Sequence, residues 1–516
     1  MRLNLLIDAE QPRRWHGRLA DALAAAGHDI SLVPVRSDRA PPLPRELDWL
    51  LLIDRTLHGA GEHALDRAPS HHQTPAPWDA DLTIDLSGTN AAAGSGRRLV
   101  ALFDGLPGER ALWAALLDQR APRLDLLDPN SGTHIAIGQT ATDAPHQLMT
   151  SADQVIARLI SGIVRAVRFD VTGTPGSGQV PCAMPSPLRS CTSALARILA
   201  VKAKRALMQR LKKAPQWHVA WRLSDAAAPL AHGALNLDEW TLLPDDGKRF
   251  YADPFAAAHE GRRYVFVEEF PYATARGLIS VAEVARDGRL LCPPRPVLET
   301  PFHLSYPQIF ADGDDIYMLP EAAASGRLTL YRAEAFPERW VPVADLLAER
   351  VHDATLVKMA DGYWIFASAD SDGGTSWDAL NLYRAPSLLG PWAPHPKNPV
   401  LVDAGGARPA GAMFRHAGAL WRPVQDCRTG YGTGLGFARI GRLDGSGFTQ
   451  TLVHSVTAPD RRGCSGVHTW NRAAGLEVVD VFGPPGLGEP TRSAGRLAAA
   501  TAGFRRLARP VQSARS

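Results

Sequence analysis

Cysteine is scarce in this sequence of 516 residues, and its five cysteines are widely spaced. They form neither a disulfide framework nor the paired spacing of a zinc site, which favours a reduced, cytoplasmic compartment. No run of 18 apolar residues is present, so no transmembrane helix is predicted. The apolar run near the N-terminus, LNLLI, is too short for the core of a signal peptide, and acidic residues follow it at once.

An excess of charge of either sign is absent as well. The 56 Lys and Arg residues nearly balance the 53 Asp and Glu residues, which leaves a net charge of +3. This balance gives no reason to expect nucleic acid as a partner. A GxGxxG turn is missing after the first predicted strand, so no dinucleotide is expected. We predict neither a cofactor nor a metal.

The length of the chain predicts more than one domain. Residues 1–170 alternate apolar runs, among them LNLLID, HDISLVPV, LDWLLLID and RLVALFDG, with helical stretches. We interpret these runs as strands of a Rossmann-like α/β domain with a doubly wound, mostly parallel sheet.

A linker and a basic helix are expected over residues 171–214. Gly, Pro and Ser are frequent up to residue 192, and residues 193–214 then carry seven basic residues and no acidic one. Such a helix either contacts an anionic membrane surface peripherally or is a solvated connection between domains.

From residue 215 to 490 the pattern changes to short strands that repeat. Each repeat has a glycine turn, a short apolar run and a polar residue. The glycines are Gly261, Gly313, Gly362, Gly418 and Gly475, at intervals of 52, 49, 56 and 57 residues. Four strands in such a length make one propeller blade. The sequence therefore predicts an all-β five-bladed propeller, followed by a basic tail over residues 491–516.

The propeller predicts where polar side chains converge. In each blade the start of the first strand and the end of the second lie on the same face, because the two strands are antiparallel. The first strands begin with Asp253, Tyr306, Asp353, Arg408 and His468, and the second strands end with Glu268, Glu321, Ser368, Gln425 and Asp480. We expect a polar funnel suited to a hydroxyl-rich ligand. The rings of Tyr272, Trp377 and Trp470 lie near these positions in the sequence and could stack on a sugar.

Each of these polar residues also has a structural interpretation. Asp253 either binds ligand or caps a turn, and His468 either functions in the site or is a satisfied histidine of the channel. Glu268 and Glu321 could instead pair with an arginine in a buried network. The segment WRPVQD adds Arg422 and Asp426 to Gln425 as candidates for substrate binding.

The segments ADPF at Asp253 and HDAT at Asp353 resemble the five-bladed propellers of glycoside hydrolase family 43. The resemblance implies that Asp253 is a general base and that Asp353 orients the general acid and tunes its pKa. In that family the acid is a glutamate at the start of the fourth blade, where this sequence has Arg408. An arginine cannot donate the proton, so Glu268 or Glu321 would have to act. An arginine and a histidine in the funnel suit an anionic sugar or a sugar phosphate.

The segments SYPQIF, LPEA, ARPAG, LWRPVQD and GVHTWN resemble the N-terminal propeller region of the plant glucosamine inositolphosphorylceramide transferases and their bacterial relatives. The resemblance implies a transferase-like, carbohydrate-active protein in surface polysaccharide or glycolipid biosynthesis, cytoplasmic or peripheral to the inner membrane. The plant proteins carry a separate glycosyltransferase domain after the propeller, so a partner glycosyltransferase is one expectation. A glycoside hydrolase and a non-catalytic glycan-binding propeller stay open, and so does whether the chain is an enzyme.

The first domain distantly resembles the N-terminal α/β domain of formyltransferases, in the order of its strands and helices and in the segment DLTIDLSG. It lacks the arrangement of catalytic Asn, His and Asp of that family. We therefore expect no formyl transfer.

Overall fold

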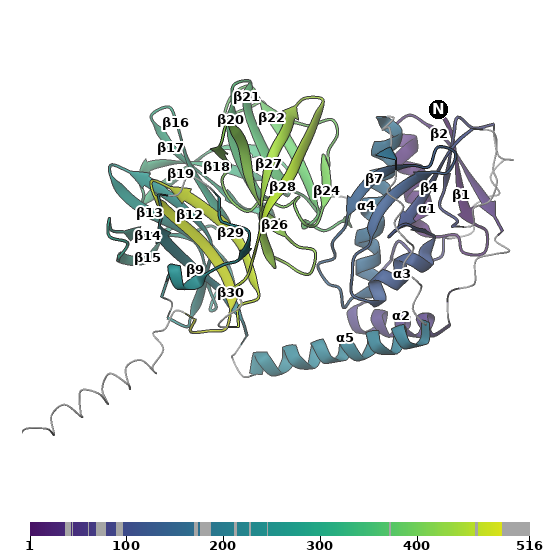
Figure 1. Cartoon of the computed structure of the whole chain (residues 1–516), viewed down its shortest axis with the longest axis horizontal. Helices are drawn as coiled ribbons and strands as arrows, with labels where there is room; N and C mark the ends of the chain where they lie inside the picture. The colour runs from purple at the N-terminus through teal and green to yellow at the C-terminus, as the bar shows by residue number, and fades with distance from the viewer. Residues whose placement is uncertain are drawn as a thin grey trace, which may run out of the picture.

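The computed structural model describes residues 1–36, 43, 45–59, 61–68, 79–88, 96–169, 174–175, 187–210, 214–225, 229–244, 246–370, 373–459 and 463–487. An α/β region and a β-rich region lie side by side, and the long helix α5 (Pro187–Arg210) runs along one edge of the molecule between them (Figure 1). The predicted tail over residues 491–516 lies outside the described residues, as does most of the predicted linker.

The N-terminal sheet has the strand order β2-β1-β3-β4-β6-β7. Its strands are β1 (Arg2–Asp8), β2 (Asp29–Val35), β3 (Leu82–Asp85), β4 (Arg97–Phe103), β6 (Arg123–Asp128) and β7 (Thr133–Gln139), with the short β5 (Leu106–Pro107) and β8 (Thr174–Pro175) at its margins. The first four run parallel, whereas β6 and β7 are antiparallel to their neighbours. The predicted parallel pairing is therefore found for β1 to β4 but not for β6 and β7. A short turn joins β6 to β7, and such a turn allows antiparallel pairing alone.

The N-terminal helices are α1 (Arg14–Ala25), α2 (Arg45–His58), α3 (Glu109–Leu117) and α4 (Leu148–Arg168). The segment LDWLLLID, which we predicted as a strand, lies in α2, so that prediction was wrong. Leu47, Leu50 and Asp54 are its buried residues, at helical spacing. A short apolar run cannot by itself distinguish a strand from a buried helix. None of the helices in the described ranges has the length and apolar character needed to cross a membrane.

The β-rich region contains four separate sheets in a propeller-like arrangement. The first is formed by β12 (Arg249–His259), β13 (Arg262–Pro271), β14 (Leu278–Val284) and β15 (Leu290–Leu298), and the second by β16 (Ser305–Asp312), β17 (Asp315–Glu321), β18 (Leu328–Ala335) and β19 (Arg339–Leu347). Another contains β25 (Phe414–His416), β26 (Ala419–Asp426), β27 (Gly434–Asp444) and β28 (Gly447–Thr457), with β10 (Gly233–Ala234) at its edge. Two 3₁₀ turns, η1 (Leu237–Glu239) and η2 (Ala323–Ser325), lie in the connections.

The fourth sheet joins the two ends of the β-rich region. Here β29 (Gly466–Ala473) and β30 (Leu476–Gly483) pair with β9 (Gln216–Leu223) and β11 (Thr241–Leu242), which come before the first blade in the chain. The pairing of β30 with β9 runs antiparallel over their whole length. Closure by strands from both ends removes an exposed sheet edge, and it was not foreseen from the sequence.

The third repeat does not form a sheet of its own. Its strands β20 (His352–Met359), β21 (Gly362–Ser368), β22 (Ala379–Ala385) and β24 (Leu401–Asp403), with β23 (Ala393–Pro394), belong to a 13-stranded sheet that continues into the N-terminal sheet. The link is parallel pairing of β24 with β7. Gly138 has φ +144° at this contact, and a Cβ there would clash with the carbonyl oxygen of Val402. The prediction of five separate blades thus differs from the four separate sheets observed.

Candidate functional site

Three first strands carry the same irregularity where the funnel was predicted. Asp253, Tyr306 and Asp353 have φ of +48°, +45° and +50°. Each lies where the register of the antiparallel pair shifts, as at a β-bulge. A non-glycine residue in this conformation costs about 1 kcal/mol or more and persists only where the surroundings hold it. Such bulges redirect side chains, often at functional sites.

Carboxylates at the ends of second strands hold two of these residues. The backbone N–H of Asp253 donates to Oδ2 of Asp480 over 2.9 Å, and the backbone N–H of Asp353 donates to Oε2 of Glu321 over 2.9 Å. In each case the carboxylate comes from one sheet and the N–H from the next. The predicted convergence of first-strand starts and second-strand ends is therefore present here as direct contacts.

A buried histidine lies between two of the carboxylates. Nε2 of His468 is 3.2 Å from Oδ1 of Asp253, and Nδ1 is 2.8 Å from Oδ1 of Asp480. Burial lowers the pKa of His468, but Asp480 and then Asp253 outweigh it and raise the pKa to about 10. The ring is thus an imidazolium near neutral pH, and it lies between the two carboxyl groups.

The same three residues are close enough to hold a metal, because their ligand atoms lie within 4.8 Å of one another. A metal needs the neutral imidazole. A metal ion here would therefore have to displace the proton that the His468 ring carries between Asp253 and Asp480.

The charge of His468 makes the stability of the protein depend on pH. Because the pKa is raised by folding, the stabilisation is complete below about pH 6.5 and is lost as the pH rises toward about 10. We expect the free energy of unfolding to fall across this window, and His468→Gln to flatten the fall. Urea unfolding of both proteins at several pH values measures it. Equal slopes for the two proteins would mean that the ion pairs contribute nothing.

Glu268 lies in an environment that disfavours its negative charge. It is 6% exposed on β13 and lies across from Ala252, next to Asp253 in the chain. Burial raises its pKa well above the usual range, and the nearby charges of Asp253 and Glu321 raise it further. This environment therefore favours the protonated form of the Glu268 carboxyl group.

His303 and Gly277 position this acid. The backbone N–H of Gly277 donates to Nδ1 of His303 over 2.9 Å, which places the ring proton on Nε2, 3.3 Å from Oε1 of Glu268. A Cβ on Gly277 would lie 2.9 Å from the same Oε1, so the close approach requires glycine. Sequence reasoning missed His303, although it lies just before the SYPQ segment.

Asp353 forms a second cluster with Arg408 and Gln425. Nε of Arg408 and Nε2 of Gln425 both donate to Oδ2 of Asp353 over 2.7 Å. Although burial lowers the pKa of Arg408, Asp353 and Glu321 raise it above its usual range. Burial likewise opposes the ionisation of Glu321, but His352 and Arg408 lower its pKa. The guanidinium is thus balanced by protein carboxylates.

Aromatic rings border these clusters. Trp217 stacks on His468 at 3.8 Å, and the ring of Tyr431 lies 5.3 Å from His468 and 5.1 Å from the guanidinium of Arg408. The ring of Trp377 is 5.7 Å from Tyr431. All three rings are partly exposed, so they offer apolar faces beside polar groups, as sugar binding requires. Trp217 and Tyr431 were not among our candidates, and only closure of the ring by β9 brings Trp217 here.

Other predicted residues have different surroundings. Arg422 donates to the carbonyl oxygens of Gly406 and Ala407, and burial lowers its pKa to about 9. Asp426 pairs with Arg428 over 2.5 Å. Within the described ranges, Arg422 and Asp426 thus have other hydrogen-bond and ion-pair partners than the residues of the two clusters. Neither lies at the bulged start of a first strand. The hydroxyl of Tyr306 contacts Oγ1 of Thr355 at 2.9 Å.

Three further predicted residues, two aromatic ones and a serine, also lie outside the two clusters. Trp470 is 1% exposed and packs in the apolar core, so it is not a platform. Tyr272 donates its hydroxyl proton to Gln216. Oγ of Ser368 is buried and has no hydrogen-bond partner within the described ranges.

The α/β region holds the loop that carries Trp377. Nε of Arg158 in α4 donates to Oδ1 of Asp378 over 2.8 Å, and Nη2 donates to the carbonyl oxygen of Thr375 over 2.5 Å. Oγ of Ser376, in the same loop, accepts from Nη1 of Arg408 over 2.7 Å. A chain of contacts therefore runs from the α/β region to the Asp353 cluster.

Fold and site together define a propeller-like β protein with a buried acidic centre bordered by aromatic rings. Residues 211–481 match the family described as glucosamine inositolphosphorylceramide transferase 1, N-terminal. This match covers more than half of the chain, and the chain belongs to that family.

Two curated relatives show the extent of the likeness. Glucosamine inositolphosphorylceramide transferase 1 of Arabidopsis thaliana is 31% identical over 256 residues, which are 49% of this chain and 33% of the relative. The protein of the same name from Oryza sativa subsp. japonica is 32% identical over 254 residues, 48% of this chain and 33% of the relative. The chain thus spans about a third of the length of these relatives. The family match begins at residue 211, so the formyltransferase resemblance of the first domain stays a prediction.

Solved structures are similar only at a low level. A thermostable family-43 glycoside hydrolase has a TM-score of 0.32 at 14% identity, over 41% of this chain and 77% of that chain. The β-xylosidase RS223 has a TM-score of 0.34 at 13% identity, over 45% of this chain and 92% of that one. Scores of this size carry no argument about function.

Proposed function

We propose that the funnel binds a carbohydrate and that the chain is a transferase-like protein of glycolipid or surface polysaccharide assembly. One observation carries the proposal: Asp253 faces an imidazolium, whereas Glu268 beside it has a raised pKa. Two neighbouring carboxyl groups in opposite protonation states are the usual basis of acid and base catalysis. The family relationship supports transfer as the reaction.

In this proposal Glu268 gives its proton to the oxygen that leaves the donor sugar. Oδ1 of Asp253 is engaged by His468 and by the hydroxyl of Thr469, at 3.2 and 2.9 Å. Oδ2 has no hydrogen-bond partner within the described ranges and would accept the proton of the acceptor hydroxyl. The general-base role predicted for Asp253 is kept, and the acid is Glu268 rather than Glu321.

The charges of the funnel favour an amino sugar over the anionic sugar that the sequence led us to expect. The buried carboxyl groups are Asp253, Glu268, Asp353 and Asp480, and Glu321 beside them is half-buried. The positive charges of Arg408 and His468 are already paired with them. An ammonium group would add the missing positive charge. The curated relatives carry glucosamine in their name, which agrees with this choice.

Calorimetric titration of the full chain with glucosamine, glucose and glucose 1-phosphate tests the proposal. We expect glucosamine to bind at least about 10-fold more tightly than glucose, and the sugar phosphate to gain nothing in the funnel. Trp377→Ala should abolish glucosamine binding. Trp49→Ala is the matched control, because Trp49 is exposed on α2. Equal affinities for glucosamine and glucose would contradict the proposal, and so would glucosamine binding that survives Trp377→Ala.

Hydrolysis is the second candidate, because it uses the same combination of a protonated and an ionised carboxyl group. Incubation with a nucleoside-diphosphate-activated amino sugar and an alcohol acceptor separates the reactions. A glycosylated acceptor supports transfer, and free reducing sugar from an oligosaccharide supports hydrolysis. Binding without either product would identify a non-catalytic module that serves a partner glycosyltransferase.

We also propose that the ring has five blades, the third of which continues into the N-terminal sheet. Strands β20, β21 and β22 pair antiparallel in order, as in the separate sheets. The peripheral membrane contact suggested for residues 193–214 stays a proposal as well. The neighbouring helix α2 exposes Trp49, Leu52 and Leu57 by 69%, 52% and 42%, and these residues favour it.

A further inference from the structure

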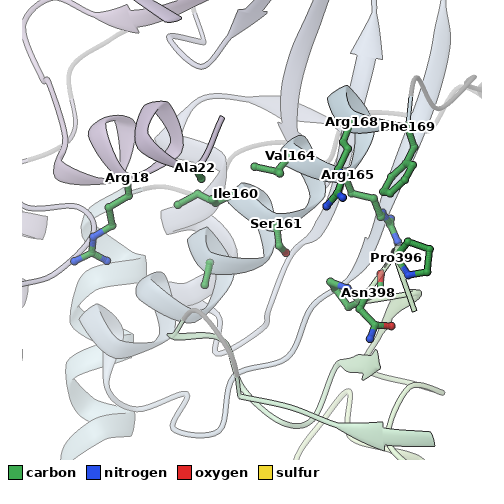
Figure 2. Close-up of a pocket in the computed structure, with 12 residues that line it drawn as sticks. Arg18, Ala22, Ile160, Ser161, Val164, Arg165, Arg168, Phe169, Pro396 and Asn398 are labelled. Carbon is green, nitrogen blue, oxygen red and sulfur yellow. Dashed lines mark hydrogen bonds between the residues drawn. The ribbon is translucent and has the colours of Figure 1, made fainter. Parts of the chain in front are cut away.

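A cavity of about 420 Å³ lies between the α/β region and the β-rich region, remote from the funnel residues in the chain (Figure 2). Its walls come from α1, α4 and the segment 396–399 that leads into β24. Small-molecule sites have volumes in this range and occur preferentially between domains. The cavity uses none of the residues of the proposed sugar site.

The charges that line this cavity are of one sign. Arg18 of α1 and Arg165 and Arg168 of α4 line it, and none of its lining residues is acidic. Figure 2 shows Arg165, Arg168 and Phe169 together at the end of α4, opposite Pro396 and Asn398. The cavity therefore has a positive end with no carboxylate among its described lining residues.

Arg165 is the most informative of these residues. It is half-buried, and its Nη1 donates a hydrogen bond to the carbonyl oxygen of Pro399 over 3.0 Å. Burial lowers its pKa, and it forms no ion pair with a described residue. Arg158, two turns earlier in the same helix, is paired with Asp378 over 2.8 Å. A cation withdrawn from water without a carboxylate calls for an anion from outside the chain.

An adjoining cavity of about 260 Å³ extends the positive surface. It shares Arg165 and Phe169 with the first cavity and adds Lys397 to the lining. The ring of Phe169 lies 5.4 Å from the guanidinium of Arg168 and 5.4 Å from Nζ of Lys397. Two cations thus lie beside this ring, and Arg165 lines the same cavities. Lys397, like Arg165, is half-buried.

A purely structural role explains only part of this arrangement. Basic residues in the last turn of a helix interact favourably with its dipole, which accounts for the exposed Arg168. It applies also to Arg165, which lies in the same last turn. It does not account for Lys397, which comes from another region of the chain and lines the same groove. Cations that line one groove repel each other, and an anion between them would remove this repulsion.

We propose that this groove binds a small molecule that carries a phosphate group. Arg165, Arg168 and Lys397 hold the phosphate oxygens, and the apolar side chains of Ile160 and Val164 on α4 contact the organic part. Guanidinium groups bind phosphate with two parallel hydrogen bonds, which suits this role. Because both regions contribute to the groove, the ligand also strengthens the contact of α4 with the segment 396–399.

Calorimetric titration of the full chain with inorganic pyrophosphate and with glucose 1-phosphate at low salt tests the proposal. Since the funnel is expected to gain nothing from a phosphate, we expect saturable binding at one site and a higher melting temperature with either probe. Arg165→Gln keeps a donor for the carbonyl of Pro399 and should weaken binding at least about 10-fold. Its melting temperature without ligand checks that it folds.

The matched control is Arg332→Gln, because Arg332 is exposed on β18 and paired with Asp315. Unchanged affinity in this variant and loss in Arg165→Gln support the proposal. Equal affinities in both variants, or no saturable binding by the unmodified chain, overturn it. Binding to phosphatidic acid vesicles without any binding of the soluble probes would assign the cations to a membrane surface and would also overturn it. Pyrophosphate carries no sugar, so the outcomes with this probe do not depend on sugar binding in the funnel.

Discussion

Glu268→Gln is expected to lower turnover by about 100-fold or more, the usual scale of general acid catalysis. The amide has nearly the same shape as the protonated carboxyl group and can still accept from His303. It cannot release a proton, however. Since no basic side chain other than a histidine is paired with Glu268 in the described ranges, the melting temperature should change little. Rates are measured with the donor and acceptor sugars identified by the binding experiments.

The neighbouring Glu269 provides the control. It is 1% exposed, lies on the opposite face of β13 and pairs with Arg249 and the hydroxyl of Ser280. Glu269→Gln should therefore cost stability, because it weakens an ion pair, and should leave the chemical step unchanged. Full turnover in Glu268→Gln would show that Glu268 is not the acid.

Arg158→Ala is expected to lower the free energy of unfolding by about 3–5 kcal/mol, because it leaves the buried Asp378 without its cation. Arg158 and Asp378 are 1% and 0% exposed in their side chains. The change also releases the carbonyl oxygen of Thr375. The loop with Ser376 and Trp377 then loses its anchor, so glucosamine binding should weaken together with stability. Urea unfolding and calorimetry measure the two effects.

The double variant Arg158→Met, Asp378→Asn separates charge from packing. It removes both charges and keeps a side chain that can accept from the backbone N–H of Ala141, which now donates to Asp378 over 2.8 Å. It should be more stable than Arg158→Ala. If Arg158→Ala unfolds like the unmodified chain, the α/β region does not support the site in the way described.

The sequence could predict the repeated strands and the end of each strand at which polar side chains lie, because both depend on a pattern that recurs within each repeat. The glycine turns located the strands of each repeat, and strand direction placed Asp253, Glu268, Glu321 and Asp353 at one end of the channel. Contacts such as that of Asp353 with Glu321 follow directly from this rule. The rule works because side chains in antiparallel pairs have a fixed register.

Features that depend on partners distant in the chain could not be predicted. A strand pattern does not state which sheet the strand joins, so β9 closing the ring and β24 pairing with β7 were both missed. Trp217 was missed with β9. Arg422 is another example. As an arginine it was predicted to bind a negatively charged ligand, but in the structure it donates to backbone carbonyl oxygens.

The central claim is that burial holds a proton on Glu268, while Asp253 beside it is paired with the imidazolium of His468. Infrared difference spectroscopy of the full chain against Glu268→Gln tests it without knowledge of the substrate. The account predicts a carboxylic acid band near neutral pH that is absent from Glu268→Gln and that disappears only as the pH is raised well above the usual range for glutamate. A spectrum in which Glu268 contributes only carboxylate bands at neutral pH would contradict the account.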